Sequence, residues 1–165
     1  MNELQQAAFE LRLNDLKRLT RDNVVLDGAL LAACSAHDPI PTAQMRVIRH
    51  LIKCGASVNE TDKNGVTPLH RAARFRSPVA AKELIASGAD VNAVDKRTGS
   101  TPLHRVVTHT GAPSTAGKED RAIELARLLL FHGADVRIKN QNGKLAIDYV
   151  KNAEFREVFA AHNAI

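Results

Sequence analysis

The stretch DKNGVTPLHRAA, residues 62–73, returns 33 residues later as DKRTGSTPLHRVV, residues 95–107. A second motif also recurs, because SGADVNAVD at 87–95 is answered by HGADVRIKN at 132–140. Two separate motifs that both recur indicate a chain built from tandem structural units. Units of this size cannot bury their apolar faces alone, so we expect neighbouring copies to stack on one another.

Each unit carries the start and stop signals of a pair of helices. Thr67-Pro68 and Thr101-Pro102 place a hydroxyl N-cap before a proline at the first helical position, where the missing N–H costs nothing. Ser77-Pro78 does the same for a second helix, whose apolar residues recur at three- and four-residue spacing. A glycine follows each expected outer helix: Gly55, Gly88 and Gly133. Glycine at this position is typical of a helix end that turns into a loop.

The 33-residue period, the TPLH tetrapeptide and the GAD element resemble the ankyrin-repeat family, whose repeat has this length and a T-P-L-H-x-A pattern. The resemblance implies an all-α solenoid of stacked helix–turn–helix repeats with projecting loops, in one domain over 1–165. We expect the following copies: an N-terminal capping copy (1–25), a diverged repeat (26–61), a clear repeat (62–94), a clear repeat with an inter-helix insertion (95–139) and a C-terminal capping copy (140–165).

The insertion follows from the spacing of the motifs. Thr67 to Gly88 spans 21 residues and Thr101 to Gly133 spans 32, so the latter repeat holds eleven extra residues between its helices. A shorter insertion of about six residues around HDPIPTAQ (37–44) occupies the same place in the diverged repeat. Both are expected to project from the same side, either as tolerated extensions or as loops that contact a partner.

The longer insertion contains GAPSTAGKED, residues 111–120, which superficially resembles a phosphate-binding loop. That loop requires four residues between its glycines and a hydroxyl residue after the lysine. Here five residues separate Gly111 from Gly117, and Glu119 follows Lys118, where its carboxylate would repel a triphosphate. We therefore interpret the stretch as a flexible inter-helix turn.

The composition is that of one folded domain with no obvious membrane segment. The 165 residues are 44% apolar and 25% charged, with a net charge of +5. No run of 18 apolar residues occurs, and the N-terminus lacks the apolar centre of a secretory signal, so we expect a cytoplasmic protein, with export into a host cell left open. Cys34 and Cys54 lie among apolar residues and are expected to be buried free thiols.

No constellation of residues for catalysis or metal binding is evident. His70 and His104 belong to the TPLH motif, and the resemblance implies that they are structural and hydrogen-bond neighbouring loops. Asp62 and Asp95 stand at the repeat starts, where aspartate organises a turn. We expect neither a cofactor nor enzymatic activity.

Positive charge collects in the windows that correspond to the family's concave binding side. Windows 63–76, 96–109 and 137–144 hold ten Lys or Arg and no Asp or Glu, where the overall composition would give about five bases and about four acids. Arginine and aromatic side chains are frequent anchors of protein interfaces. The predicted partner-binding residues are Lys63, Arg71, Arg74, Phe75, Arg76, Lys96, Arg97, Arg105, His109, Lys139, Lys144 and Tyr149.

The resulting hypothesis is a module that binds an acidic or polar protein surface through a basic concave face. The alternative is a nucleic-acid-binding protein that uses the same face, which the 4% aromatic content and the absence of a known nucleic-acid motif disfavour. Charged residues in both terminal copies favour a monomer.

Overall fold

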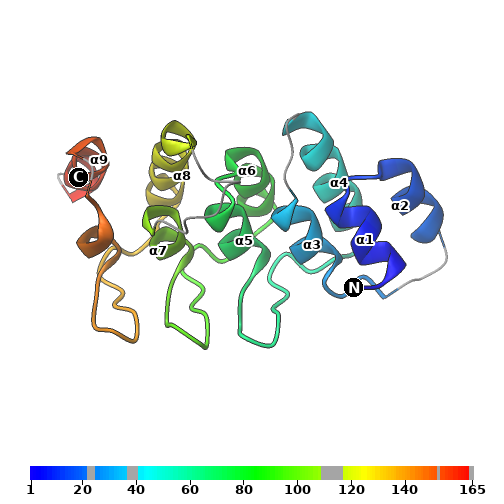
Figure 1. Ribbon diagram of the computed structural model, residues 1–165, viewed down its shortest axis with the longest axis horizontal. Helices are drawn as coiled ribbons and strands as arrows, with labels where there is room; N and C mark the ends of the chain where they lie inside the picture. The colour runs from blue at the N-terminus through cyan, green and yellow to red at the C-terminus, as the bar shows by residue number, and fades with distance from the viewer. Residues whose placement is uncertain (22–24, 37–40, 109–116, 152, 164–165) are drawn as a thin grey trace.

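The computed structural model describes residues 1–21, 25–36, 41–108, 117–151 and 153–163, and the regular structure within them is helical. Inner and outer helices alternate along the chain (Figure 1): α1 (Glu3–Phe9) and α2 (Leu13–Leu19), α3 (Ala29–Ser35) and α4 (Pro41–Lys53), α5 (Pro68–Arg74) and α6 (Pro78–Ala86), α7 (Pro102–Val107) and α8 (Glu119–Phe131), and the 3-10 helix η2 (Ala146–Tyr149) with α9 (Ala153–Asn163).

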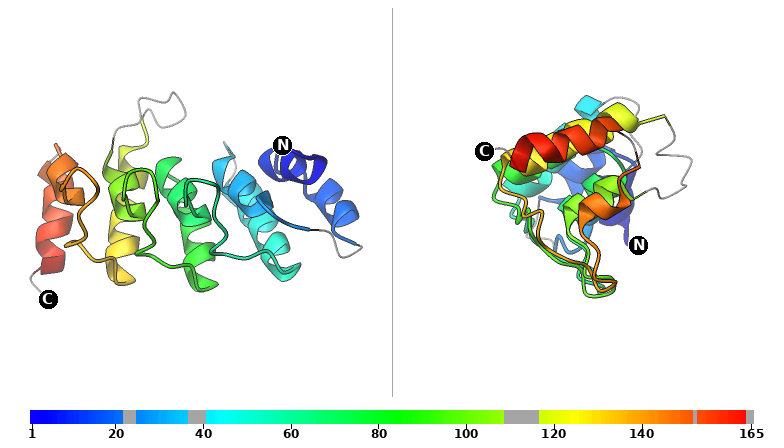
Figure 2. Two further views of the ribbon diagram at one scale, coloured as in Figure 1. Left: turned by 90° about the horizontal axis from the view of Figure 1, so that it is seen from below. Right: turned by 90° about the vertical axis from the view of Figure 1, so that its left-hand side faces the viewer.

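The helices form two layers, because the helices of the first four pairs pack on each other and each layer is continuous from one pair to the next. Inner helices contact in the order α1, α3, α5, α7, η2, and outer helices in the order α2, α4, α6, α8, α9. Two further views show the same row of stacked pairs, with loops standing off to one side (Figure 2). The predicted all-α ankyrin solenoid is confirmed.

The predicted helix starts form as the sequence indicates. The Thr67 hydroxyl accepts a hydrogen bond from the His70 amide at 3.3 Å, and Pro68 takes the first helical position of α5. Thr101 and Pro102 repeat this arrangement at the start of α7. Ser77 caps α6 in the same way through the Ala80 amide.

Glycines end the outer helices, as predicted. The backbone of Gly55, Gly88 and Gly133 has φ of 95°, 88° and 85°, a region that side chains with a Cβ disfavour. In each case the amide of the following alanine bonds back into the last helical turn, as Ala89 does to Leu84 at 3.0 Å. The chain then turns out into a loop instead of continuing the helix.

The core lies between the layers and is made of small and branched apolar residues. Ala72 and Ala73 of α5 and Leu84 of α6 are fully buried, and the close contact of inner and outer helices depends on the two alanines. In α7 their places are taken by Val106 and Val107, which are buried as well.

Three projecting loops, here called the fingers, connect one repeat to the next at 57–66, 90–100 and 135–145 (Figure 1). Neighbouring fingers bond through their tips, because the Lys96 amide donates to the Asn64 carbonyl at 2.8 Å and the Gln141 amide to the Thr98 carbonyl at 2.9 Å. The fingers therefore form a continuous row. Their backbone-to-backbone bonds hold the row rigid beside the inner helices.

Two expectations need correction. Residues 41–44 of the predicted shorter insertion begin α4 and are helical, while 37–40 lie outside the described residues. The larger insertion also adds helix, since α8 has 13 residues against 9 in α6. Residues 109–116 lie outside the described part of the chain.

The cysteines are free, but only one of them is buried. Cys34 is fully buried in α3, whereas Cys54 is exposed after the last turn of α4. The expectation of two buried thiols was therefore wrong for Cys54. A position directly after a helix can face solvent even when the preceding residues are apolar.

Candidate protein-interaction surface

In each finger one polar residue, Asp62, Asp95 or Asn140, pairs with a side chain on the inner helix that follows. Arg71 of α5 donates from Nη2 to Oδ2 of Asp62 at 2.9 Å. Asp62 also accepts from the amides of Asn64 and Val66, so the carboxylate fixes both the turn and the arginine. Burial acts to raise the pKa of Asp62, but these hydrogen bonds outweigh it and hold the pKa below its ordinary value.

The next repeat contains the equivalent ion pair, and there it is more buried. Arg105 donates from Nη2 to Oδ2 of Asp95 at 2.9 Å and to the Thr98 hydroxyl at 3.3 Å. The Asp95 side chain has no exposed surface, and burial acts to raise its pKa. Hydrogen bonds from Thr98 and the charge of Arg105 outweigh burial, so the pKa of Asp95 lies below its ordinary value.

The last copy replaces this ion pair with a neutral one. Asn140 stands where the aspartates stand, and its Nδ2 donates to the Tyr149 hydroxyl at 2.8 Å. Tyr149 therefore pairs with Asn140 as Arg71 pairs with Asp62 and Arg105 with Asp95. In each copy this position fastens a finger to an inner helix.

Arg74 and Arg97 are exposed and make no ion pair among the described residues. The guanidinium carbon of Arg74 lies 5.9 Å from the centre of the Phe75 ring, a cation–π contact. Burial, followed by the charges of Arg71, Arg105 and Arg97, lowers the pKa of Arg74. The charges of these three arginines therefore act on Arg74.

The remaining predicted cations lie along the fingers. The exposed lysines are Lys63, Lys96, Lys139 and Lys144. Arg137, which belongs to the same sequence windows, donates to both carboxylate oxygens of Asp135 at 3.0 and 3.1 Å. We call the following cations of the fingers and inner helices, which leave out the Asp135-bound Arg137, the basic face: Lys63, Arg71, Arg74, Lys96, Arg97, Arg105, Lys139 and Lys144.

Two predicted residues stand apart from the basic face. Arg76 is buried, with 7% of its side chain exposed, and approaches Oε1 of Glu119 at 4.0 Å. Its backbone has φ of 54°, because the chain reverses there between α5 and α6. His109 lies outside the residues that the structure describes. Arg76 was predicted to bind a partner because it is charged, and its charge gives no sign that its side chain is buried.

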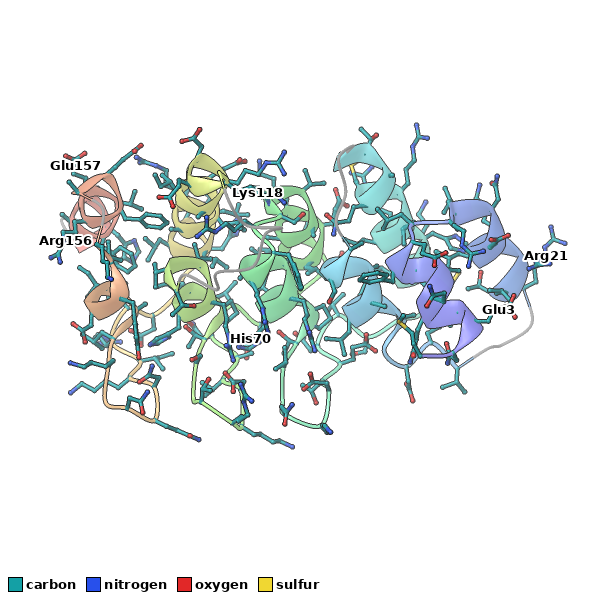
Figure 3. The ribbon with its side chains drawn as sticks, in the orientation of Figure 1. Glu3, Arg21, His70, Lys118, Arg156 and Glu157 are labelled. Atoms are coloured by element: carbon teal, nitrogen blue, oxygen red, sulfur yellow. The ribbon has the colours of Figure 1, made fainter. Side chains whose placement is uncertain are left out.

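The two TPLH histidines join one repeat to the next, as the resemblance implied. Figure 3 labels the first of them, His70. Nδ1 of His70 accepts from the Thr67 amide at 3.2 Å, so Nε2 carries the proton and donates to the Ser100 carbonyl at 2.9 Å. His104 bonds in the same way to Thr101 and to the Lys144 carbonyl. Burial lowers the pKa of both rings and favours their neutral form.

Some other kinds of site find no support in the described part of the chain. None of its helices is long and apolar enough to cross a membrane. Nor do its His, Cys, Asp and Glu residues form a group of three or more that could hold a metal ion. The geometry presents a rigid surface with a patterned charge.

Comparison with known proteins identifies the family. Residues 30–140 match the family described as ankyrin repeats (3 copies), and the chain belongs to this family. Ankyrin repeats are generally protein-interaction modules and are typically non-catalytic.

Curated proteins from animals and a virus share this sequence pattern. The chain is 30% identical over 114 residues to SMC5-SMC6 complex localization factor protein 1 of Bos taurus, covering 68% of this chain and 10% of that protein. It is 36% identical over 99 residues to putative ankyrin repeat protein FPV031 of Fowlpox virus (strain NVSL), covering 59% and 26%. It is 54% identical over 67 residues to neurogenic locus Notch protein of Drosophila melanogaster, covering 40% and 2%. The chain thus spans about a quarter or less of the length of these relatives.

Proposed function

We propose that this chain is a non-catalytic module that binds an acidic protein surface through the basic face. The observation that carries the proposal is that Arg74 and Arg97 are exposed and make no ion pair among the described residues, beside the paired Arg71 and Arg105 whose charges also act on Arg74. The positive charges of Arg74 and Arg97, which no described carboxylate balances, are unfavourable beside the other cations of this face. An acidic partner would relieve their repulsion, which favours complementary association.

The four arginines are expected to play different roles. Arg71 and Arg105 are tied to Asp62 and Asp95, so much of their charge is already balanced within the chain. Arg74 and Arg97 are exposed, and their guanidinium groups are available to a partner. The partner should therefore depend most on Arg74 and Arg97, with the Phe75 ring supporting the first of them.

This difference determines how the proposal is tested. Changing Arg71 or Arg105 would leave a carboxylate without its cation, so a loss of binding could reflect altered finger geometry. The double variant Arg74→Glu/Arg97→Glu avoids that problem. Its matched control is Arg46→Glu/Arg127→Glu, which makes the same change of charge at exposed positions of the outer helices α4 and α8.

The experiment uses immobilised protein and nuclease-treated lysate from the source cells, followed by quantitative mass spectrometry. We expect an acidic protein that binds the wild type and the outer-helix control but is lost from Arg74→Glu/Arg97→Glu. Binding of the purified partner should weaken with added salt. A partner retained equally by all three proteins would contradict the assignment of the basic face. A ligand that is captured from a parallel untreated lysate and lost after nuclease treatment would favour nucleic acid instead.

A further inference from the structure

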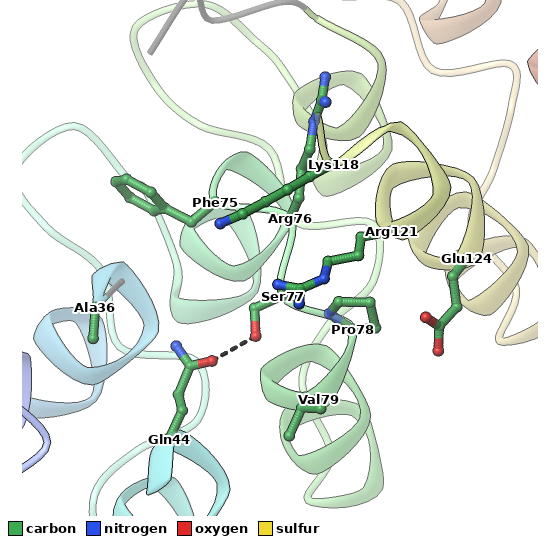
Figure 4. A pocket seen from close by; sticks show the side chains of 10 residues that line it. All are labelled: Ala36, Gln44, Phe75, Arg76, Ser77, Pro78, Val79, Lys118, Arg121 and Glu124. Carbon is green, nitrogen blue, oxygen red and sulfur yellow. Dashed lines mark hydrogen bonds between the residues drawn. The ribbon is translucent and has the colours of Figure 1, made fainter. Parts of the chain in front are cut away.

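A separate cavity of about 170 Å³ lies where the α5–α6 turn meets the starts of α4 and α8 (Figure 4). Phe75, Pro78 and Val79 supply apolar surface, and Ser77 and Gln44 lie at its base. The volume corresponds to a few water molecules at about 30 Å³ each, which is the scale of one side chain. The cavity can therefore hold part of a ligand, such as one residue of a peptide.

The base of the cavity is held by hydrogen bonds within one repeat and between it and the next. The Ser77 hydroxyl donates to Oε1 of Gln44 at 2.5 Å and accepts from the Ala80 amide. Nε2 of Gln44, which is buried, donates to the Ala33 carbonyl at 2.9 Å. These bonds join α3, α4 and α6, so the cavity is formed before any ligand arrives.

Two cations from the start of α8 extend over this base. Figure 4 shows the Lys118 ammonium directed toward Phe75 and the Arg121 guanidinium directed toward Ser77. Neither makes an ion pair within the described residues. Burial, followed by the charges of Arg121 and Arg76, lowers the pKa of Lys118, which places these cations near one another.

Two nearby acids, Glu124 and Glu119, lie against other cations. Glu124, the acid that lines the cavity, has Oε1 2.7 Å from Nζ of Lys82 on the neighbouring helix α6. Glu119 lies 4.0 Å from Arg76, whose guanidinium points away from Ser77 (Figure 4). Lys118 and Arg121 therefore give the cavity a net positive charge over an apolar wall.

We propose that this cavity binds the anionic side chain of a peptide, a carboxylate or a phosphoryl group, with Lys118 and Arg121 as its charged contacts. The ammonium and guanidinium groups match the oxygens of either anion. Phe75, Pro78 and Val79 contact the carbon atoms that carry it. The charged contacts of this site differ from those of the basic face, although Phe75 lines the cavity and also lies under Arg74, and its ligand need not be the partner proposed above.

The test uses small defined probes and isotope-labelled protein observed by NMR. Acetyl-glutamate amide and acetyl-phosphoserine amide are titrated separately, with acetyl-glutamine amide as the neutral control. We expect saturable shift changes at Ser77, Lys118 and Arg121 from the anions and none from the neutral probe. Tighter binding of the phosphoserine probe assigns a phosphoryl ligand, and equal or weaker binding assigns a carboxylate.

Matched variants separate the cavity from general surface charge. Lys118→Gln/Arg121→Gln should weaken binding by about fivefold or more, whereas Arg127→Gln, an exposed position on the same helix, should leave it unchanged. Equal weakening by Arg127→Gln would overturn the proposal. So would shifts of the same size at Lys63 and Arg97, or the absence of saturation. None of these results bears on the basic face, because its variants change other residues.

Discussion

The buried histidine of the TPLH motif is predicted to stabilise the stack in its neutral form. Replacing His70 with leucine would remove the donor to the Ser100 carbonyl and the acceptor of the Thr67 amide. The carbonyl would keep a second donor, since the Asp95 amide lies 3.0 Å away, but no other described partner reaches the Thr67 amide.

The magnitude follows from that difference. A hydrogen bond contributes about 1 kcal/mol net, and a buried donor left unpaired costs about 1–3 kcal/mol. We therefore expect His70→Leu to lower the free energy of unfolding by about 2–4 kcal/mol. His132→Leu, at an exposed position, should stay within about 0.5 kcal/mol of the wild type.

The lowered pKa of His70 also sets how the free energy of unfolding should change with pH. The pKa of His70 is lowered in the folded state, so the unfolded chain binds more protons as pH falls below the ordinary histidine value of about 6.5. The stabilisation is present above that pH and is lost as pH falls toward the folded pKa. His104 behaves alike, and burial and the charge of Lys17 also lower the pKa of His50.

Urea unfolding followed by far-ultraviolet circular dichroism suits this test, because the chain has no tryptophan. The wild type should be less stable at about pH 5 than at about pH 7.5, and His70→Leu should reduce that difference. The reasoning is refuted if His70→Leu is as stable as the wild type at about pH 7.5. It is also refuted if the variant keeps the full pH dependence.

Three further predictions test the fingers and the thiols. Gly99→Ala should lower the free energy of unfolding in urea by about 1–3 kcal/mol, and by more than Gly133→Ala does. Both glycines have positive φ, but only at Gly99 would an added Cβ meet a backbone amide, Gln141 N at 2.9 Å. Equal losses would contradict the close packing of the fingers. The double variant Asp62→Asn/Arg71→Tyr copies the Asn140–Tyr149 pair. Its loss of unfolding free energy should be smaller than the sum of the losses of the two single variants by about 0.5 kcal/mol or more. Additive effects would show that the two pairs are not equivalent. Cys54 should react with a thiol reagent in the folded protein, whereas Cys34, whose pKa is raised by burial, should react only on unfolding; equal rates would contradict the packing of α3.

The fold could be predicted from the sequence because its signals are local. Thr-Pro starts α5 and α7, glycine follows α4, α6 and α8, and the recurrence of TPLH sets the repeat. Each signal acts within one turn of chain, and stacking follows from the apolar faces. The helical start of α4 was missed because HDPIPTAQ was interpreted as a loop insertion, although its second proline, Pro41, also suits a first helical position.

The basic face was less predictable because a sequence shows where the charged residues are but not which of them form ion pairs. Arg71 and Arg105 looked like free anchors, yet each is held by the aspartate that opens its own repeat. A signal was present, since Asp and Arg recur together in both clear repeats at nearly the same separation. The burial of Arg76 and the cavity under Lys118 depend on how α5, α6 and α8 meet, which no local pattern encodes.

The central claim is that a partner binds the basic face, and an amide NMR footprint of the bound partner tests it most directly. Isotope-labelled protein is titrated with the partner isolated by affinity capture, and the perturbed amides are placed on the structure. The account predicts that they cluster in 63–76, 96–108 and 137–144, with Arg74 and Arg97 among the most affected. Perturbations confined to the outer helices α4, α6, α8 and α9 would contradict it.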